Sequence, residues 1–211
     1  DVRKVIRTLV DKDSFFELKA RFGKVGVTGL ARLGGKTVGL IANNPLYKGG
    51  ALDTDACEKI TSFIVLCDSF NIPLVMLVDT PGFVIGTEAE KKRAPGKIMN
   101  FMNAMTLVTV PKLSVILRKS YGRAYVCMGG GRHADDIAAW PTAEVSLDRS
   151  SRICAARRAS HRQPSLGLAF RPTAGDDAEQ LWTVGRSAVA SRIARRPRGS
   201  IHRIGLVAEV A

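Results

Sequence analysis

The sequence has 211 residues, of which 45% are hydrophobic and 24% are charged, proportions that are ordinary for a globular protein. No apolar run reaches the roughly 18 to 20 residues of a membrane span, and the first residues do not form a signal peptide. The net charge is +13, of which residues 1–148 contribute +5 and residues 149–211 contribute +8. Most of the excess positive charge therefore lies in the last third of the chain.

The first 50 residues predict a short helix followed by a β-hairpin. Residues 1–19 contain the helix, a turn around residues 11–13 and a brief apolar segment. Residues 26–33 alternate as a strand does, Gly34 and Gly35 make a hairpin turn, and residues 37–42 form the returning strand. The stretch NNPLYKGG at 43–50 is rich in turn formers and predicts a loop.

From residue 52 onward, helices alternate with buried strands. The expected elements are an amphipathic helix over 52–70 capped by Asp53 or Thr54, a strand over 73–79, a helix over 88–105, a strand over 112–118, a strand-to-helix turn over 120–128 and a strand beginning at 143–147. The second helix places four side chains on one face as core filling: Ile98, Met99, Met102 and Met105. This alternation implies crossover connections and a mainly parallel inner sheet. The predicted fold is α/β and resembles the spiral of strand-strand-helix units of the ClpP/crotonase superfamily.

The chain changes in kind at Asp148. Residues 149–211 hold 12 Arg and no Lys, and no helical or strand period persists in them. A nucleic-acid-binding tail, a disordered tail and the translation of GC-rich DNA in a shifted frame are the three interpretations. The abrupt change favours the third, and only Phe170 and Trp182 could stack on bases. We therefore expect neither nucleic acid nor a membrane as a partner.

The most informative segment is PLVMLVDTPGF at 73–83, a buried strand that ends in an acid and a Pro-Gly turn. Such a turn exposes backbone amides at the carboxyl edge of a sheet, where α/β proteins bind ligands. The letters DTPG also occur in GTPases, which additionally need the phosphate loop G-x-x-x-x-G-K-[ST]. Gly35-Lys36-Thr37 ends like that motif, but Leu30 stands at its first glycine and no N-K-x-D motif follows. The GTPase interpretation is rejected.

A second candidate site is KSYGRAYVCMGGG at 119–131. Gly122 permits a tight strand-to-helix turn, after which the amides of Arg123 and Ala124 would point outward. Two such amides can form an oxyanion hole for a carbonyl or ureido oxygen. Gly122 could equally serve tight packing alone, and the residues do not decide between the two interpretations.

A third candidate is Gly49-Gly50, for which a plain helix entry is the favoured interpretation. No nucleophile, triad or metal site is expected, because Ser120 and Cys127 lack a histidine partner and the four cysteines and three histidines have no metal-ligand spacing. Reduced thiols favour a cytoplasmic protein. An enzyme using these amides would work by oxyanion stabilisation, with a cofactor supplying the reactive groups.

Four blocks carry a resemblance: GLARLGGKTVGLIANNP, GGALDTDACEKITSFIVLCDSFNIPLVMLVDTPGF, VPKLSVILRKSYGRAY and AAWPTAEVS. With these blocks, residues 1–148 resemble the carboxyl-terminal half of the carboxyltransferase (β) subunit of biotin-dependent acyl-CoA carboxylases, of the propionyl-CoA and methylcrotonyl-CoA carboxylase type. The predicted organisation is therefore a partial crotonase-like carboxyltransferase domain over residues 1–148 and an unrelated Arg/Ala/Ser-rich tail over residues 149–211.

The resemblance implies transfer of CO₂ from carboxybiotin, carried on a biotin carboxyl carrier protein, to the α-carbon of an acyl-CoA. The amides of Arg123 and Ala124 would hold the biotin ureido oxygen, although the family usually has Gly at the position of Arg123. Val126 matches a position that lines the acyl pocket. The remaining binding residues that it implies are Tyr121, Gly122, Tyr125, Pro81, Gly82 and Phe83, to which the loop adds Gly49 and Gly50.

The resemblance also implies partners: a biotin carboxylase subunit, an amino-terminal carboxyltransferase half that this chain lacks, and further copies in a homo-oligomer. We therefore expect little activity from this polypeptide alone. A biotin-coupled acyl-CoA decarboxylase and a non-catalytic remnant that docks onto other subunits remain as alternatives.

Overall fold

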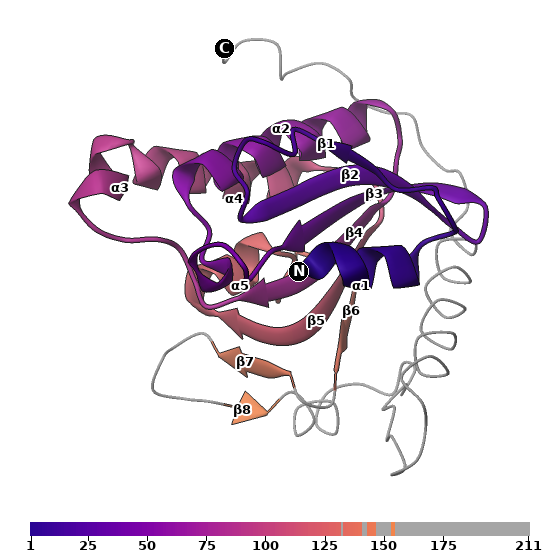
Figure 1. The fold of residues 1–211 in the computed structure, drawn as a ribbon. Coiled ribbons are helices and arrows are strands. Elements are labelled where there is room, and N and C mark those ends of the chain that lie inside the picture. Colours follow the sequence, from indigo (N-terminus) through magenta and orange to yellow (C-terminus); the bar gives the residue numbers. More distant parts are fainter. Residues whose placement is uncertain (132, 141–142, 147–152, 155–211) are drawn as a thin grey trace.

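The computed structural model describes residues 1–131, 133–140, 143–146 and 153–154. The strands of these residues form one sheet in the order β1-β2-β3-β4-β5-β7-β8, and β6 also pairs with β5 (Figure 1). No helix in the described part of the chain is long and apolar enough to cross a membrane.

A helix and a hairpin build the first edge of the sheet. Helix α1 (Val2–Leu9) is capped by Asp1 and precedes the short strand β1 (Phe16–Leu18). Strands β2 (Gly26–Leu33) and β3 (Lys36–Asn43) then pair antiparallel along their full length. The predicted hairpin is confirmed, because glycines with positive φ at its turn provide the backbone conformation that the tight connection needs.

The inner sheet is parallel, as predicted. Strand β4 (Leu74–Thr80) lies between β3 and β5 (Lys112–Tyr121), parallel to both. The outer side of β5 pairs with two strands in succession: its first part with β6 (Asp136–Ala139) and its last part with β7 (Glu144–Ser146). Strand β6 was not predicted, because its four residues are too few to show a period.

The helix predicted over 88–105 is two helices, α3 (Thr87–Lys91) and α4 (Ala94–Leu107). Pro95 lacks an N–H and is tolerated only in a first helical turn, and Arg93 before α4 takes a left-handed conformation (φ 56°). The predicted methionine face is partly wrong as well: Met105 is buried, but Met99 is 51% exposed. Phe101 takes the buried position on α4 instead.

Helices cover both faces of the sheet (Figure 1). Helix α2 (Thr54–Ser69), capped by Asp53 as predicted, lies with α4 and α5 (Gly122–Cys127) on one face, around a core that includes Ile60, Phe63 and Phe101. Helix α1 covers the other face, where its Val2, Ile6 and Leu9 join a second core. The α/β architecture is therefore confirmed. Of the predicted tail, only β8 (Ile153–Cys154), antiparallel to β7, lies within the described residues.

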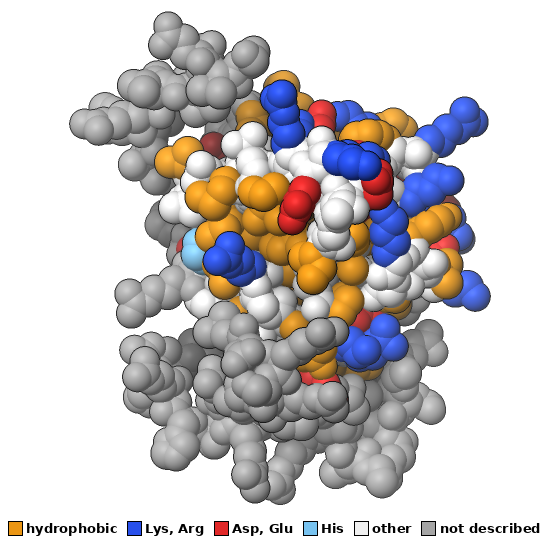
Figure 2. Space-filling view, turned by 90° about the vertical axis from the view of Figure 1, so that its left-hand side faces the viewer, with side chains coloured by type: hydrophobic (Ala, Val, Ile, Leu, Met, Phe, Trp, Pro, Cys, Tyr) orange, Lys and Arg blue, Asp and Glu red, His pale blue; other side chains and the backbone are white. Residues whose placement is uncertain are grey.

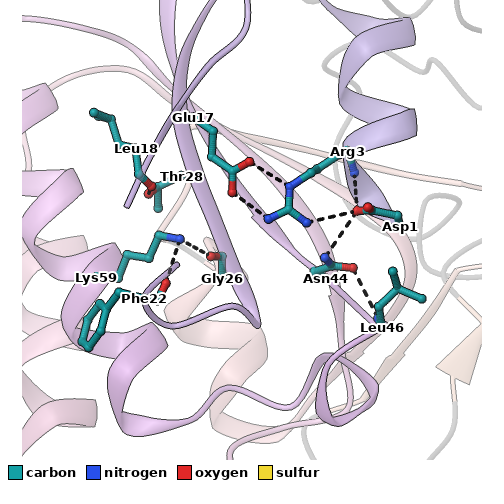
Figure 3. Close-up of polar contacts among 10 residues, drawn as sticks. All are labelled: Asp1, Arg3, Glu17, Leu18, Phe22, Gly26, Thr28, Asn44, Leu46 and Lys59. Atoms are coloured by element: carbon teal, nitrogen blue, oxygen red, sulfur yellow. Dashed lines mark hydrogen bonds and ion pairs between the residues drawn. The ribbon is translucent and has the colours of Figure 1, made fainter. Parts of the chain in front are cut away.

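A buried lysine joins α2 to the start of β2. Lys59 is only 1% exposed, and its Nζ donates to the carbonyl oxygens of Phe22 (3.1 Å) and Gly26 (2.8 Å), as Figure 3 shows. Burial lowers the pKa of this ammonium group from 10.5 to about 8. Nearby, Arg3 makes a two-pronged hydrogen bond to the carboxylate of Glu17 (2.8 and 2.7 Å), which joins α1 to β1.

Candidate functional site

Three neighbouring parallel strands end at one edge of the sheet. Strand β3 ends at Asn43, β4 at Thr80 and β5 at Tyr121, and Thr80 lies opposite Ser120 in the register of β4 and β5. Open α/β sheets bind ligands outside the carboxyl ends of their strands, so this edge is the candidate site. Figure 2 views the molecule from the side on which α3 and α5 lie in Figure 1, and hydrophobic side chains gather there among Lys and Arg side chains.

The Asp79–Gly82 turn is held by hydrogen bonds of its side chains, one of them to Arg118 on β5. Asp79 is buried and accepts a hydrogen bond from Arg118 Nε (3.2 Å). The Thr80 hydroxyl donates to the Gly82 carbonyl oxygen (3.1 Å) and accepts from the Gly82 amide (3.3 Å). Gly82 has a φ of 138°, which L side chains rarely adopt. The turn is thus a rigid wall at the carboxyl edge.

The glycine pair that ends like a phosphate loop has another role. The amides of Gly34 and Gly35 donate to the two carboxylate oxygens of Asp11, at 3.1 and 2.7 Å. Strand β3, not a helix, follows them. These amides are occupied by a carboxylate of the same chain and lie in a hairpin, so the rejection of the GTPase interpretation is confirmed.

The Gly49-Gly50 loop lies directly against the Asp79–Gly82 turn. It forms a 3₁₀ turn, η1 (Lys48–Gly50), a few residues before α2 begins. Gly50 has a φ of 87°, and a Cβ there would overlap the Asp79 carbonyl oxygen. The amide of Leu52 also donates to the Gly82 carbonyl oxygen (2.9 Å). The structure therefore brings two predicted segments, Gly49-Gly50 and Pro81-Gly82-Phe83, side by side.

The Gly122 turn stands at the end of β5, next to β4. Tyr121 is extended, and Gly122 has a φ of 61° with open space where a Cβ would be. Arg123 is exposed, whereas Ala124 is fully buried. Amides in the first turn of a helix have no intrahelical acceptor, so those of Arg123 and Ala124 are free of helix bonding. The turn that sequence predicted is present.

The next two predicted residues differ in their surroundings. Tyr125 is half-buried, packs against the core, and its hydroxyl accepts from the Gly131 amide (2.9 Å). Its ring is thereby engaged with the Gly129–Gly131 turn. Val126 is half-buried on α5, at the same end of the sheet.

Three residues at this edge were not predicted as part of the site. The Tyr121 hydroxyl donates to Glu144 on β7. Asn43 Oδ1 accepts from the Asp79 amide (3.2 Å) and so connects the ends of β3 and β4. Asn43 Nδ2 and Ser120 Oγ have no hydrogen-bond partner among the described residues, although both atoms are buried. The Glu in WPTAEVS was a visible signal, but its partner lies 23 residues away in sequence.

The three cysteines whose side chains the structure describes do not offer a nucleophile. Cys57, Cys67 and Cys127 are buried and free, and burial raises the pKa of each thiol to about 12. A thiolate is the nucleophilic form, so these side chains are inert near neutral pH. What the edge offers chemically is the set of backbone amides at the Gly122 turn, beside the Asp79–Gly82 turn at the end of β4.

Known proteins resemble this chain in sequence. The family described as "Carboxyl transferase domain" matches residues 1–147. The biotin-dependent long chain acyl-coenzyme A carboxylase beta4 subunit of Mycobacterium tuberculosis is 40% identical over 148 residues, 70% of this chain and 28% of that protein. The methylmalonyl-CoA carboxyltransferase 12S subunit of Propionibacterium freudenreichii is 43% identical over 148 residues, again 70% of this chain and 28% of that protein.

Solved structures agree with the sequence comparison. A crystal structure of transcarboxylase 12S, a hexamer with hydrolysed methylmalonyl-coenzyme A bound, matches with a TM-score of 0.68 and 42% identity. The match covers 70% of this chain and 29% of that one. The crotonase-like fold predicted from the sequence is confirmed. The chain spans less than a third of the length of these relatives.

Proposed function

The chain belongs to the carboxyl transferase domain family, and on this premise we propose that it is the carboxyltransferase portion of a biotin-dependent acyl-CoA carboxylase. In this role the N1–carboxyl bond of carboxybiotin would break, the carboxyl group would form a bond to the α-carbon of an acyl-CoA thioester, and the proton lost from that carbon would end on N1 of biotin. The observation that carries the proposal is the first turn of α5, where the amides of Arg123 and Ala124 lie free of helix bonding at the carboxyl edge of the sheet.

The chemistry of this chain is electrostatic. Carboxybiotin, when bound, supplies the carboxyl group. The amides of Arg123 and Ala124 would donate to the ureido oxygen and would stabilise the negative charge that develops there. Because Ala124 is fixed in the core, these donors need little rearrangement as the charge develops. The open space at Gly122 admits a ligand close to the backbone.

The remaining predicted residues shape the cleft. We assign one wall to Gly49, Gly50, Pro81, Gly82 and Phe83, and the other to Tyr121, Gly122, Tyr125 and Val126. Val126 is small and apolar, which suits a modest α-substituent on the acyl group. The close packing of Gly50 on Asp79 supports the first wall.

The proposed partners rest on the biotin-dependent relatives and on the hexamer of the transcarboxylase 12S structure. A biotin carboxyl carrier or biotin carboxylase subunit would deliver the cofactor. An amino-terminal carboxyltransferase half, in an oligomer, would bind most of the acyl-CoA. We expect these 211 residues alone to turn over carboxybiotin and propionyl-CoA slowly, and a rate near that of an intact carboxylase would contradict this.

We further propose that the carboxyltransferase portion ends at residue 148 and that residues 149–211 come from a shifted reading frame. The family match, which ends at residue 147, supports this boundary. The coding DNA tests it: a family-like continuation in another frame after codon 148 is the expected result, and none in any frame would be evidence against it.

Amide hydrogen exchange with free biotin tests the proposed site. Biotin is expected to slow exchange at Gly122–Tyr125. Lipoic acid is a matched control, because it has the same acid chain but no ureido group, and it should leave these amides unchanged. Absence of protection by biotin would favour a docking remnant without a biotin site.

A further inference from the structure

Glu144 lies beside the Gly122 turn, and nothing in the function proposed above uses it. We propose that Glu144 is a positioning residue for the amides of Arg123 and Ala124, and that it acts through the Tyr121 hydroxyl. The inference rests on the proposed function for its consequence, but its structural part can be tested without any ligand.

A site made of backbone amides depends on whatever holds the backbone. Gly122 has no atom within 4 Å of where its Cβ would be, and the side chain of Arg123 is exposed. Neither residue is fixed by packing of its own. The orientation of the Arg123 and Ala124 N–H groups is therefore set by the residues on either side, Tyr121 before the turn and Ala124 after it.

The anchor after the turn is apolar. Ala124 is fully buried and belongs to the same core cluster as Ala143, the residue before β7. Val145 on β7 packs against this cluster too. Strand β7 therefore supports the far side of the turn through van der Waals contact.

The anchor before the turn is polar. The Tyr121 hydroxyl donates to Glu144 Oε2, and the backbone of Tyr121 lies opposite Ser146 in the register of β5 and β7. Lys119 lies opposite Glu144, yet no ion pair joins Glu144 to a Lys or Arg of the described residues. The carboxylate is thus directed to the tyrosine rather than to a cation.

The residues that contact Tyr121 and Ala124 lie on or next to one short strand, β7. Strand β7 has three residues and pairs with only the last three of β5. A hydrogen bond to an ionised group contributes more than a neutral one, so the Tyr121–Glu144 contact is a large part of what holds so short a pairing. Its loss would loosen Gly122 and Arg123 without unfolding the core.

The test compares four variants of the full chain: E144A, E144Q, Y121F and, as a surface control, E90A on α3. Glutamine keeps an oxygen that accepts from Tyr121, and Glu90 is exposed. Without ligand, E144A and Y121F should speed amide exchange in the β5–β7 pairing, Lys119–Tyr121 with Glu144–Ser146, because the hydrogen bonds of that pairing protect its amides. The expected acceleration is roughly tenfold, the lower end for a hydrogen bond to a charged group. E144Q keeps an acceptor but loses the charge, so it should lie between wild type and E144A, and E90A should match wild type. The Tm should change little in all four.

The double variant E144A/Y121F separates a hydrogen bond from two independent effects. It should exchange no faster than either single variant, because both remove the same contact. Wild-type exchange in E144A, or additive effects in the double variant, would overturn the inference, as would equal acceleration by E144Q and E144A. Biotin is then added as the probe: its protection of the Gly122–Tyr125 amides should weaken more in E144A than in E144Q. If biotin protects no wild-type amide, the proposed function fails while the ligand-free comparison still decides the role of Glu144.

Discussion

Replacing Lys59 with methionine removes a buried ammonium group and keeps a long, flexible side chain in its place. The fall of the pKa of Lys59 from 10.5 to about 8 corresponds to a cost of about 3 kcal/mol for keeping this group charged in the folded protein. The substitution also leaves the carbonyl oxygens of Phe22 and Gly26 without this donor, at about 1 kcal/mol each. K59M should therefore be about 1 kcal/mol more stable than wild type at pH 7.

The stability difference between wild type and K59M should also depend on pH. Between pH 8 and 10.5 the unfolded chain keeps a proton on Lys59 that the folded chain has lost, so wild-type stability gains from rising pH in this window. The three buried cysteines act the other way above pH 9, because their pKa values near 12 make the folded state keep protons that the unfolded state loses. Both proteins share the cysteines, so the difference between them isolates Lys59.

Urea unfolding followed by far-UV circular dichroism, at intervals from pH 7 to pH 10, gives this difference. Wild type should gain on K59M by about 2 to 3 kcal/mol across the series and become the more stable of the two by about pH 9. K59R is the contrasting variant: a larger group that stays charged should be destabilised throughout. A constant difference between wild type and K59M would refute the assignment of a depressed pKa to Lys59.

Three further substitutions test the carboxyl edge. R123P removes one amide donor at a helix position that tolerates proline, so it should weaken biotin binding about tenfold in calorimetry. R123G keeps the amide and should bind biotin as wild type does. Equal binding by the two variants would contradict the role of the amide. G50A places a Cβ against the Asp79 carbonyl oxygen at a φ of 87° and should lower the stability to urea by about 2 kcal/mol, and an unchanged midpoint would argue against this contact. N43L removes the acceptor for the Asp79 amide, so that amide should exchange at least tenfold faster; an unchanged rate would show that Asn43 does not hold the turn.

Local signals in the sequence were sufficient for much of the fold. The hairpin over 26–33 and 36–43 was predicted nearly residue for residue, because Gly34-Gly35 and the alternation on either side both report it. The break between α3 and α4 also had a local signal, Pro95, which an apolar period running through 88–105 obscured. Where periodicity and a breaker disagreed, the missing N–H of proline decided the outcome.

The site was predictable only in its backbone turns. Gly122 and Gly82 could be recognised as turn positions in the sequence, because few residues other than glycine adopt their positive φ values. Tyr121 and Glu144, by contrast, meet only because β7 returns to the end of β5, which no local pattern reports. Lys59 was hidden in the same way: on an amphipathic helix a lysine predicts a solvated face, and only the packing of the loop before β2 against α2 buries it.

A crystal structure of this chain with biotin bound would test the proposed amide site. We expect the ureido oxygen within about 3 Å of the amide nitrogens of both Arg123 and Ala124, with the ring lying between the Gly122 turn and the Pro81–Phe83 wall. Biotin bound elsewhere, or at this edge with its ureido oxygen turned away from both amides, would contradict it.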